Sequence, residues 1–89
     1  MREFVVSTAL KKDIKLSKKR GKDLTVFKQI VQHLINGEPI PATFKDHPLV
    51  GNWNGYRELH LETDFLFIYR LTETELYGQR LGTHADLFK

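Results

Sequence analysis

Three of the four histidines in this 89-residue chain fall in its second half, each at or near the predicted end of a structural element. His47 ends a long loop, His60 closes a predicted strand and His84 follows the last predicted strand. Imidazole has an unperturbed pKa of about 6.5, so it exchanges protons readily at neutral pH. Strand ends and loops held by a rigid sheet are also where functional side chains concentrate. We therefore interpret these three histidines as candidate acid–base groups, and His33 as a structural residue of a helix.

Asp64 adds a carboxylate to this set, because it lies in the turn after the strand that His60 closes. Cleavage of RNA by its own 2′-hydroxyl needs one group that takes the 2′ proton and another that protonates the departing 5′ oxygen. A positive group must also offset the charge that develops on the phosphate. Histidines, a carboxylate and an arginine supply these roles without a metal or other cofactor. Two alternatives stay open: a zinc site built from His60-x-x-x-Asp64 and a distant histidine, or ordinary surface histidines.

The positive charges are concentrated in the first third of the chain. Residues 1–30 contain nine Lys or Arg against three acidic residues, whereas residues 31–89 contain five against eight. A basic segment of this kind is typical of proteins that bind a polyanion or an acidic partner, although a solvated helix face has the same composition. Such a segment would attract an RNA backbone electrostatically.

The composition predicts a folded protein with one domain, residues 1–89. Hydrophobic residues make up 40% and charged residues 28% of the chain, which is ordinary for a globular domain. No apolar run approaches the roughly 20 residues that a membrane span needs, and the start lacks the apolar stretch of a signal peptide. We therefore expect a cytoplasmic protein without membrane contact. The absence of cysteine excludes disulfides and thiolate metal sites.

Helical periodicity dominates the first half. The Ser-Thr pair at 7–8 is expected to cap a helix that ends at Gly21, and Asp23 to cap a second helix that ends at Asn36-Gly37. The second helix is the clearest element, since its apolar residues recur at helical spacing over three turns: Leu24, Phe27, Ile30, Val31, Leu34 and Ile35.

A period of two replaces the helical one from Tyr56 onward. Glu58 and His60 share one face of their strand, and Leu59 and Leu61 share the other. The order β-α-α-β-β-β predicts an α+β fold: an antiparallel four-stranded sheet with two helices packed on one face. The opposite face is expected to be an open concavity that exposes polar residues. The predicted strands are 2–6, 56–61, 65–69 and 76–81, followed by a short terminal segment, 84–88.

The second half resembles the YafQ-like branch of the RelE/ParE toxins, which come from bacterial toxin–antitoxin pairs. The blocks that carry the resemblance lie in order and at the family's spacing over residues 45–88, whereas the first half agrees only in its pattern of elements. The blocks are Lys45-Asp46-His47-Pro48-Leu49, Gly51-x-Trp53, Gly55-Tyr56-Arg57-Glu58-x-His60-x-x-x-Asp64, Ile68-Tyr69 and Arg80-x-Gly82-Thr83-His84-x-x-Leu87-Phe88.

This resemblance implies a ribosome-dependent endoribonuclease that cleaves messenger RNA in the A site of the 70S ribosome and is neutralised by a cognate antitoxin. We expect His84 to be the general acid, with Asp64 or His47 as the base. His60 would then orient the scissile phosphate or balance its charge. Matching motif positions identify five active-site residues: His47, His60, Asp64, His84 and Phe88.

Residues outside this set are expected to have binding roles. Arg80 is a further candidate for phosphate contact. Four lysines of the first helix are expected to contribute to binding of the ribosomal substrate: Lys11, Lys15, Lys18 and Lys19. The main alternative is a toxin of the same fold without enzymatic activity, which would block a protein target such as DNA gyrase. A third interpretation is an antitoxin-bound RNA-binding module without turnover.

Overall fold

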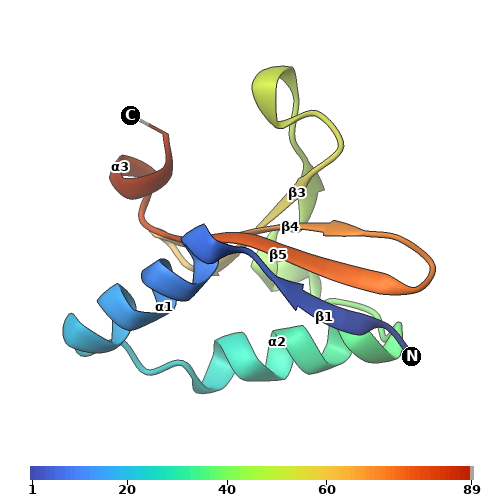
Figure 1. Ribbon diagram of the computed structural model, residues 1–89, viewed down its shortest axis with the longest axis horizontal. Helices are drawn as coiled ribbons and strands as arrows, with labels where there is room; N and C mark the ends of the chain where they lie inside the picture. Colours follow the sequence, from blue (N-terminus) through green and yellow to red (C-terminus); the bar gives the residue numbers. More distant parts are fainter. Residues whose placement is uncertain (89) are drawn as a thin grey trace.

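The computed structural model describes residues 1–88 as two helices packed against one face of a mixed sheet (Figure 1). A third, very short helix stands over the other face. The elements in chain order are β1 (Glu3–Val6), α1 (Thr8–Lys19), α2 (Thr25–Asn36), the 3-10 turn η1 (Ala42–Phe44), β2 (His47–Pro48), the 3-10 turn η2 (Gly51–Trp53), β3 (Arg57–Glu62), β4 (Phe65–Leu71), β5 (Glu75–Gly82) and α3 (His84–Leu87).

The sheet has five strands in the order β1-β5-β4-β3-β2, and β1 runs parallel to β5. The α+β class is therefore confirmed. The predicted four-stranded antiparallel sheet is wrong in two respects: it lacked the short strand β2, and it did not have β1 parallel to β5. The strand β2 contains only two residues, too few for any alternation, and its proline is tolerated because β2 lies at a sheet edge. The direction of β1 could not be predicted, because its partner β5 lies more than 70 residues further along the chain and the pairing depends on how the intervening elements pack.

A third helix was also missing from the prediction. It spans His84–Leu87 and begins with a capping box, in which the Thr83 hydroxyl accepts from the Asp86 N–H and the Asp86 carboxylate accepts from the Thr83 N–H. Four residues are too few for helical periodicity, so only the Thr-x-x-Asp pair marked this helix in the sequence. His84 is therefore the first residue of a helix rather than part of an irregular tail.

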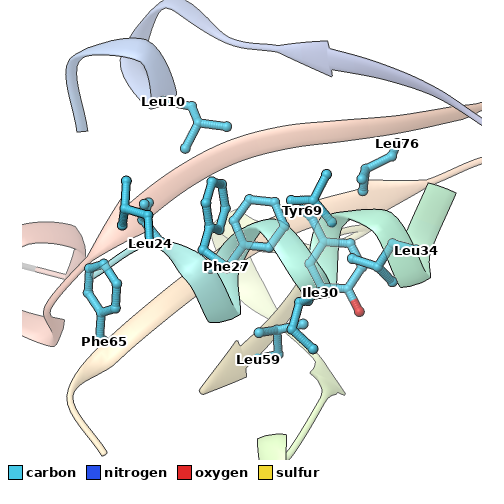
Figure 2. Close-up of a cluster of buried hydrophobic side chains, with 12 residues drawn as sticks. Leu10, Leu24, Phe27, Ile30, Leu34, Leu59, Phe65, Tyr69 and Leu76 are labelled. Atoms are coloured by element: carbon cyan, nitrogen blue, oxygen red, sulfur yellow. The ribbon is translucent and has the colours of Figure 1, made fainter. Parts of the chain in front are cut away.

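The main core lies between the helical layer and the sheet. The apolar stripe predicted for α2 is confirmed, since Phe27, Ile30 and Leu34 are all buried against the sheet (Figure 2). The rings of Phe27 and Phe67 meet edge to face, with their centroids 5.1 Å apart. No helix within residues 1–88 has the length and apolar character needed to cross a membrane.

A second, smaller cluster covers part of the opposite sheet face. Leu66 and Ile68 of β4 pack there against Leu87 of α3. The expected open concavity is therefore only partial, because α3 and the loop that contains η2 rise from this face and flank it (Figure 1). Half-buried side chains complete the cluster: Leu49, Trp53 and Tyr56.

Candidate active site

Three imidazole rings lie in a row on the sheet face opposite α1 and α2. The centroid of the His60 ring is 6.0 Å from that of His47 and 5.9 Å from that of His84. His47 comes from the edge strand β2, His60 from β3 and His84 from the start of α3. The three histidines selected from the sequence are thus brought together, with His60 in the middle, while His33 lies on α2.

Asp64, in the turn between β3 and β4, fixes the orientation of His84. Its Oδ1 atom accepts from the backbone N–H of His84 at 2.8 Å and lies 2.6 Å from Nδ1 of the ring. The backbone contact and then the ring contact lower the pKa of Asp64, so this carboxylate stays ionised at neutral pH. A carboxylate only accepts hydrogen bonds, so Nδ1 carries the hydrogen and Nε2 of His84 is left for chemistry.

Glu58 is a site residue that the sequence interpretation missed. Its side chain is only 7% exposed, and its Oε1 atom lies 3.2 Å from Nε2 of His60. The other oxygen lies 3.8 Å from Nε2 of His47. A buried carboxylate needs charged or hydrogen-bonding partners, and here two imidazoles supply them. The sequence did contain a signal for this role, because period-two spacing already placed Glu58 on the same strand face as His60.

His47 is positioned by the residues that precede it. Its Nδ1 atom lies 2.6 Å from the carbonyl oxygen of Lys45, a residue in the left-handed region with φ of 50°. Asp46 is anchored on the opposite sheet face, where it accepts from the Tyr69 hydroxyl at 2.6 Å and from Nε of Arg57 at 3.2 Å. Burial, reinforced by Asp46, raises the pKa of the Tyr69 hydroxyl, so it remains a donor. Arg57 is therefore structural.

The helix α3, which carries His84, is tied to the end of α1. Arg20 donates to the Asp86 carboxylate at 2.7 Å, and this ion pair together with the Thr83 cap lowers the pKa of Asp86 to about 2. Phe88 follows this helix, remains 38% exposed and has its ring centroid 6.3 Å from that of His84. Phe88 is thus available beside the histidines.

Arg80 is less free than its proposed phosphate contact would require. Its Nε and one terminal nitrogen donate to the two oxygens of Asp13 on α1, at 2.7 and 3.2 Å. The sheet register places Glu58, Ile68 and Arg80 in one row across β3, β4 and β5. The backbone of Arg80 thus places its side chain on the sheet face of the histidines, but the guanidinium is directed toward α1. The four lysines named on α1 are all exposed: Lys11, Lys15, Lys18 and Lys19.

An open cavity of about 390 Å³ borders the histidine row next to His60. It lies between η1 and the end of β3. This hollow leaves one side of the central imidazole accessible. Its lining residues are Thr43, Phe44, Lys45, His60, Leu61, Glu62 and Thr63.

Two of the histidines and the buried glutamate also form a set of possible metal ligands. One donor atom from each of His47, Glu58 and His60 lies within 4.8 Å of the others. Imidazole nitrogens and carboxylate oxygens are donors that zinc and copper accept, so the set fits such an ion. The zinc site considered from the sequence used Asp64 instead, but the structure pairs Asp64 with His84.

The fold and the sequence match the toxin component of a bacterial toxin–antitoxin pair. Residues 2–89 match the family model described as the bacterial toxin of a type II toxin–antitoxin system, YafQ. The chain therefore belongs to the YafQ toxin family, which confirms the resemblance found in its motifs.

Relatives of known structure agree with this assignment. The mRNA interferase toxin YafQ of Escherichia coli K12 is 48% identical over 88 residues, which is 98% of this chain and 96% of the relative. A chain in the crystal structure of the E. coli DinJ-YafQ complex has a TM-score of 0.92 at 46% identity, with 100% of both chains covered. A metal-bound toxin from Helicobacter pylori has a TM-score of 0.92 at 37% identity, over 99% of this chain and 100% of that one.

Proposed function

We propose that this chain is an mRNA interferase, an endoribonuclease that cleaves messenger RNA in the ribosomal A site and is neutralised by a cognate antitoxin. The E. coli relative bears the name mRNA interferase toxin, and a DinJ-YafQ complex is known for E. coli. The observation that carries the proposal is the row of three imidazoles with His60 at its centre. Groups on either side of a central phosphate-binding residue suit a reaction that needs a base and an acid at opposite ends.

His84 acts as the general acid in this proposal. The Asp64 carboxylate holds Nδ1, so the proton on Nε2 is free to be transferred to the departing 5′ oxygen. The same carboxylate stabilises the charged imidazolium before transfer. In this proposal Asp64 therefore orients the general acid and does not serve as the base. Of the two candidate bases that the sequence offered, Asp64 and His47, this leaves His47.

His47 is the general base that remains. A backbone carbonyl only accepts, so the contact with Lys45 places the hydrogen of the neutral imidazole on Nδ1. The lone pair is then on Nε2, which can take the proton of the attacking 2′-hydroxyl. As the 2′ oxygen bonds to phosphorus, the bond from phosphorus to the 5′ oxygen breaks, and the proton from His84 completes the leaving group.

His60 supplies positive charge at the phosphate between the base and the acid. Its partner Glu58 balances that charge within the protein at 3.2 Å and keeps the ring in place. Such preorganised charge stabilises the transition state because no solvent has to reorient during the reaction. Phe88 offers an exposed ring on which a neighbouring base can stack.

The proposed cleavage proceeds without a metal ion. A zinc or copper ion on His47, Glu58 and His60 would supply a Lewis acid at this place. It would also occupy the His47 nitrogen that the acid–base mechanism needs for proton transfer and the His60 nitrogen that it needs for positive charge. We therefore expect a bound transition metal to inhibit this toxin.

Cleavage should depend on the ribosome. The site offers few polar side chains to hold an RNA in line, and correct positioning is worth on the order of 7–11 kcal/mol of a reaction barrier. We expect A-site cleavage on programmed ribosomes and much slower cleavage of the same RNA alone, measured by mapping the RNA ends. Equal rates and sites on naked RNA would contradict ribosome dependence, and intact RNA in both cases would favour a toxin with a protein target.

The products should reveal the metal-free route. Attack by the 2′-hydroxyl leaves a 2′,3′-cyclic phosphate or its 3′-phosphate product on one fragment and a 5′-hydroxyl on the other. Chelation with EDTA, at a magnesium level that keeps ribosomes intact, should leave the rate unchanged, whereas added zinc should lower it. Loss of cleavage with EDTA and its recovery with zinc would replace this mechanism by a metal-dependent one.

The lysines of α1 should affect binding rather than chemistry. Each charge that contacts a phosphate displaces counterions, so removing the charges should weaken ribosome binding and flatten its salt dependence. The saturated single-turnover rate should change little, with Lys28→Ala on α2 as the control. A large loss in the saturated rate would instead show that α1 shapes the active site. The variant combines Lys11→Ala, Lys15→Ala, Lys18→Ala and Lys19→Ala.

A further inference from the structure

The row of rings does not end at the histidines. The ring of Phe88, beside His84, is followed by Trp53 of η2 at 6.2 Å between centroids. Trp53 is followed in turn by Tyr56 at 5.7 Å. Trp53 and Tyr56 are half-buried against Leu66 and Ile68, so each has one part held by the protein and another part in solvent. A continuous series of aromatic side chains therefore extends from His84 toward the start of β3.

Arg70 continues this row along β4. Its guanidinium carbon lies 5.9 Å from the ring centroid of Tyr56 and 4.6 Å from that of Tyr77. The side chain is exposed. Within residues 1–88, Arg70 is the one arginine whose guanidinium makes neither a hydrogen bond nor an ion pair with the protein. Its positive charge is thus held between two rings but is not neutralised.

The sheet register places this group on the same face as the active site. Arg70 is paired with Tyr77 across β4 and β5, and its neighbour Tyr69 is buried in the main core on the other face. Alternation along β4 therefore directs Arg70 to the face of Leu66 and Ile68, where the histidines lie. We call Trp53, Tyr56, Arg70 and Tyr77 the Arg70 strip.

We infer that the Arg70 strip binds the single-stranded RNA that extends from the scissile phosphate past His84. Partly exposed rings on either side of a free cation suit single-stranded RNA, because bases stack on the rings and phosphates approach the charge. Arg suits this role better than Lys, since its planar group stacks and donates several hydrogen bonds. The inference rests on the proposed function, because it extends the RNA that the histidines would cleave.

The strip also has a defined end. The hydroxyl of Tyr77 donates to Glu75 at 2.5 Å, and Glu3 is the register partner of Glu75 on the adjacent strand β1. These two carboxylates would repel phosphate beyond Tyr77. An acidic peptide would be repelled in the same way, so it is the aromatic rings of the strip, on which bases can stack, that favour RNA as the occupant.

Binding can be measured without cleavage by using 2′-O-methyl RNA, which lacks the attacking hydroxyl. Fluorescently labelled trinucleotides and nonanucleotides, extended on either the 5′ or the 3′ side of a common core, are titrated with the toxin at low salt by anisotropy. We expect extension on one side to tighten binding and extension on the other to have little effect. Electrophoresis afterwards checks that the oligonucleotides remain intact.

Two substitutions of Arg70 separate its charge from its stacking. Arg70→Ala should weaken binding of the extended oligonucleotide by roughly fivefold or more and reduce the salt slope by about one, with no effect on the trinucleotide. Arg70→Lys should keep the salt slope but recover only part of the affinity, because the ammonium does not stack. Lys28→Ala, an exposed cation on α2, is the control and should bind all oligonucleotides as the parent does.

Other results would overturn the inference. Affinity that does not rise with length, or that falls equally in Arg70→Ala and Lys28→Ala, would mean that the Arg70 strip is not an RNA site. Unchanged oligonucleotide binding with weaker ribosome binding in Arg70→Ala would assign the strip to ribosomal RNA or protein instead of messenger RNA. Failure of the proposed function is separate, because it would appear as cleavage of the 2′-O-methyl RNA or as unchanged activity without the histidines.

Discussion

Replacing His84 with glutamine is expected to lower the single-turnover rate on programmed ribosomes by on the order of 10²–10⁴, the usual loss when a general acid is removed. Glutamine keeps the approximate size of histidine and can still hydrogen-bond to Asp64, but it has no proton to transfer at neutral pH. The His84 side chain is 53% exposed, so its contribution to the core is small. Circular dichroism and antitoxin binding should therefore match the parent.

The control for this experiment is His33→Gln on α2, which removes an imidazole from the opposite layer and should leave the rate unchanged. A folded His84→Gln protein that cleaves within about threefold of the parent would exclude His84 as the acid, since the loss would lie well below the usual range. The proton donor would then have to be His60.

The lowered pKa of Asp64 also predicts how pH affects this pair. The carboxylate is ionised above the usual Asp range of about 4 and is protonated only when the pH falls below that range. Its contact with His84 is therefore fully present around neutrality and is lost only in acid. Titration of Asp64 should therefore not change the rate near pH 7, and Asp64→Asn should lower the rate without creating a new titration there.

Replacing Glu58 with glutamine should produce the second large effect, a loss of about 10–100-fold in the saturated cleavage rate. Glutamine fits the same buried space, but it cannot balance a positive charge on His60 or accept equally at both oxygen positions. The polar atoms around it would then be only partly satisfied, which costs more when they are buried. Ribosome binding should change little, because Glu58 lies behind the imidazoles and is only 7% exposed.

Glu62→Gln is the matched control, since Glu62 is an exposed residue of the same strand and pairs with Lys22 at the surface. It should retain the parental rate. The same pair of variants tests the metal site: inhibition by zinc should weaken in Glu58→Gln and persist in Glu62→Gln. A Glu58→Gln protein with parental activity would mean that the buried carboxylate only supports folding.

Local chemistry was sufficient to predict several parts of this protein. The stripe of α2 from Phe27 to Leu34 repeats at helical spacing, and burying it requires no knowledge of distant contacts. The shared face of Glu58 and His60 likewise follows from the period of a strand. The histidine motifs and their spacing were enough to identify the family, which in turn implied that separate segments form one site.

Contacts between distant segments decided the rest. A strand of two residues such as β2, or a helix of four such as α3, contains too little periodicity to be recognised and is stable only against its neighbours. The burial of Glu58 between His47 and His60 depends on β2 pairing with β3. The pairing of Asp64 with His84 joins residues that are 20 positions apart.

The roles of charged residues depend most on the tertiary structure. Arg80, Arg57 and Arg70 are chemically identical in the sequence, and only the fold distinguishes them. Asp13 neutralises the first and Asp46 the second, whereas the third lies between two tyrosines and makes no ion pair with any residue from 1 to 88. The sequence alone determined which chemical groups are available, but the free energy of a charge depends on what lies within a few ångströms. Those neighbours are assembled only when the sheet and helices pack together.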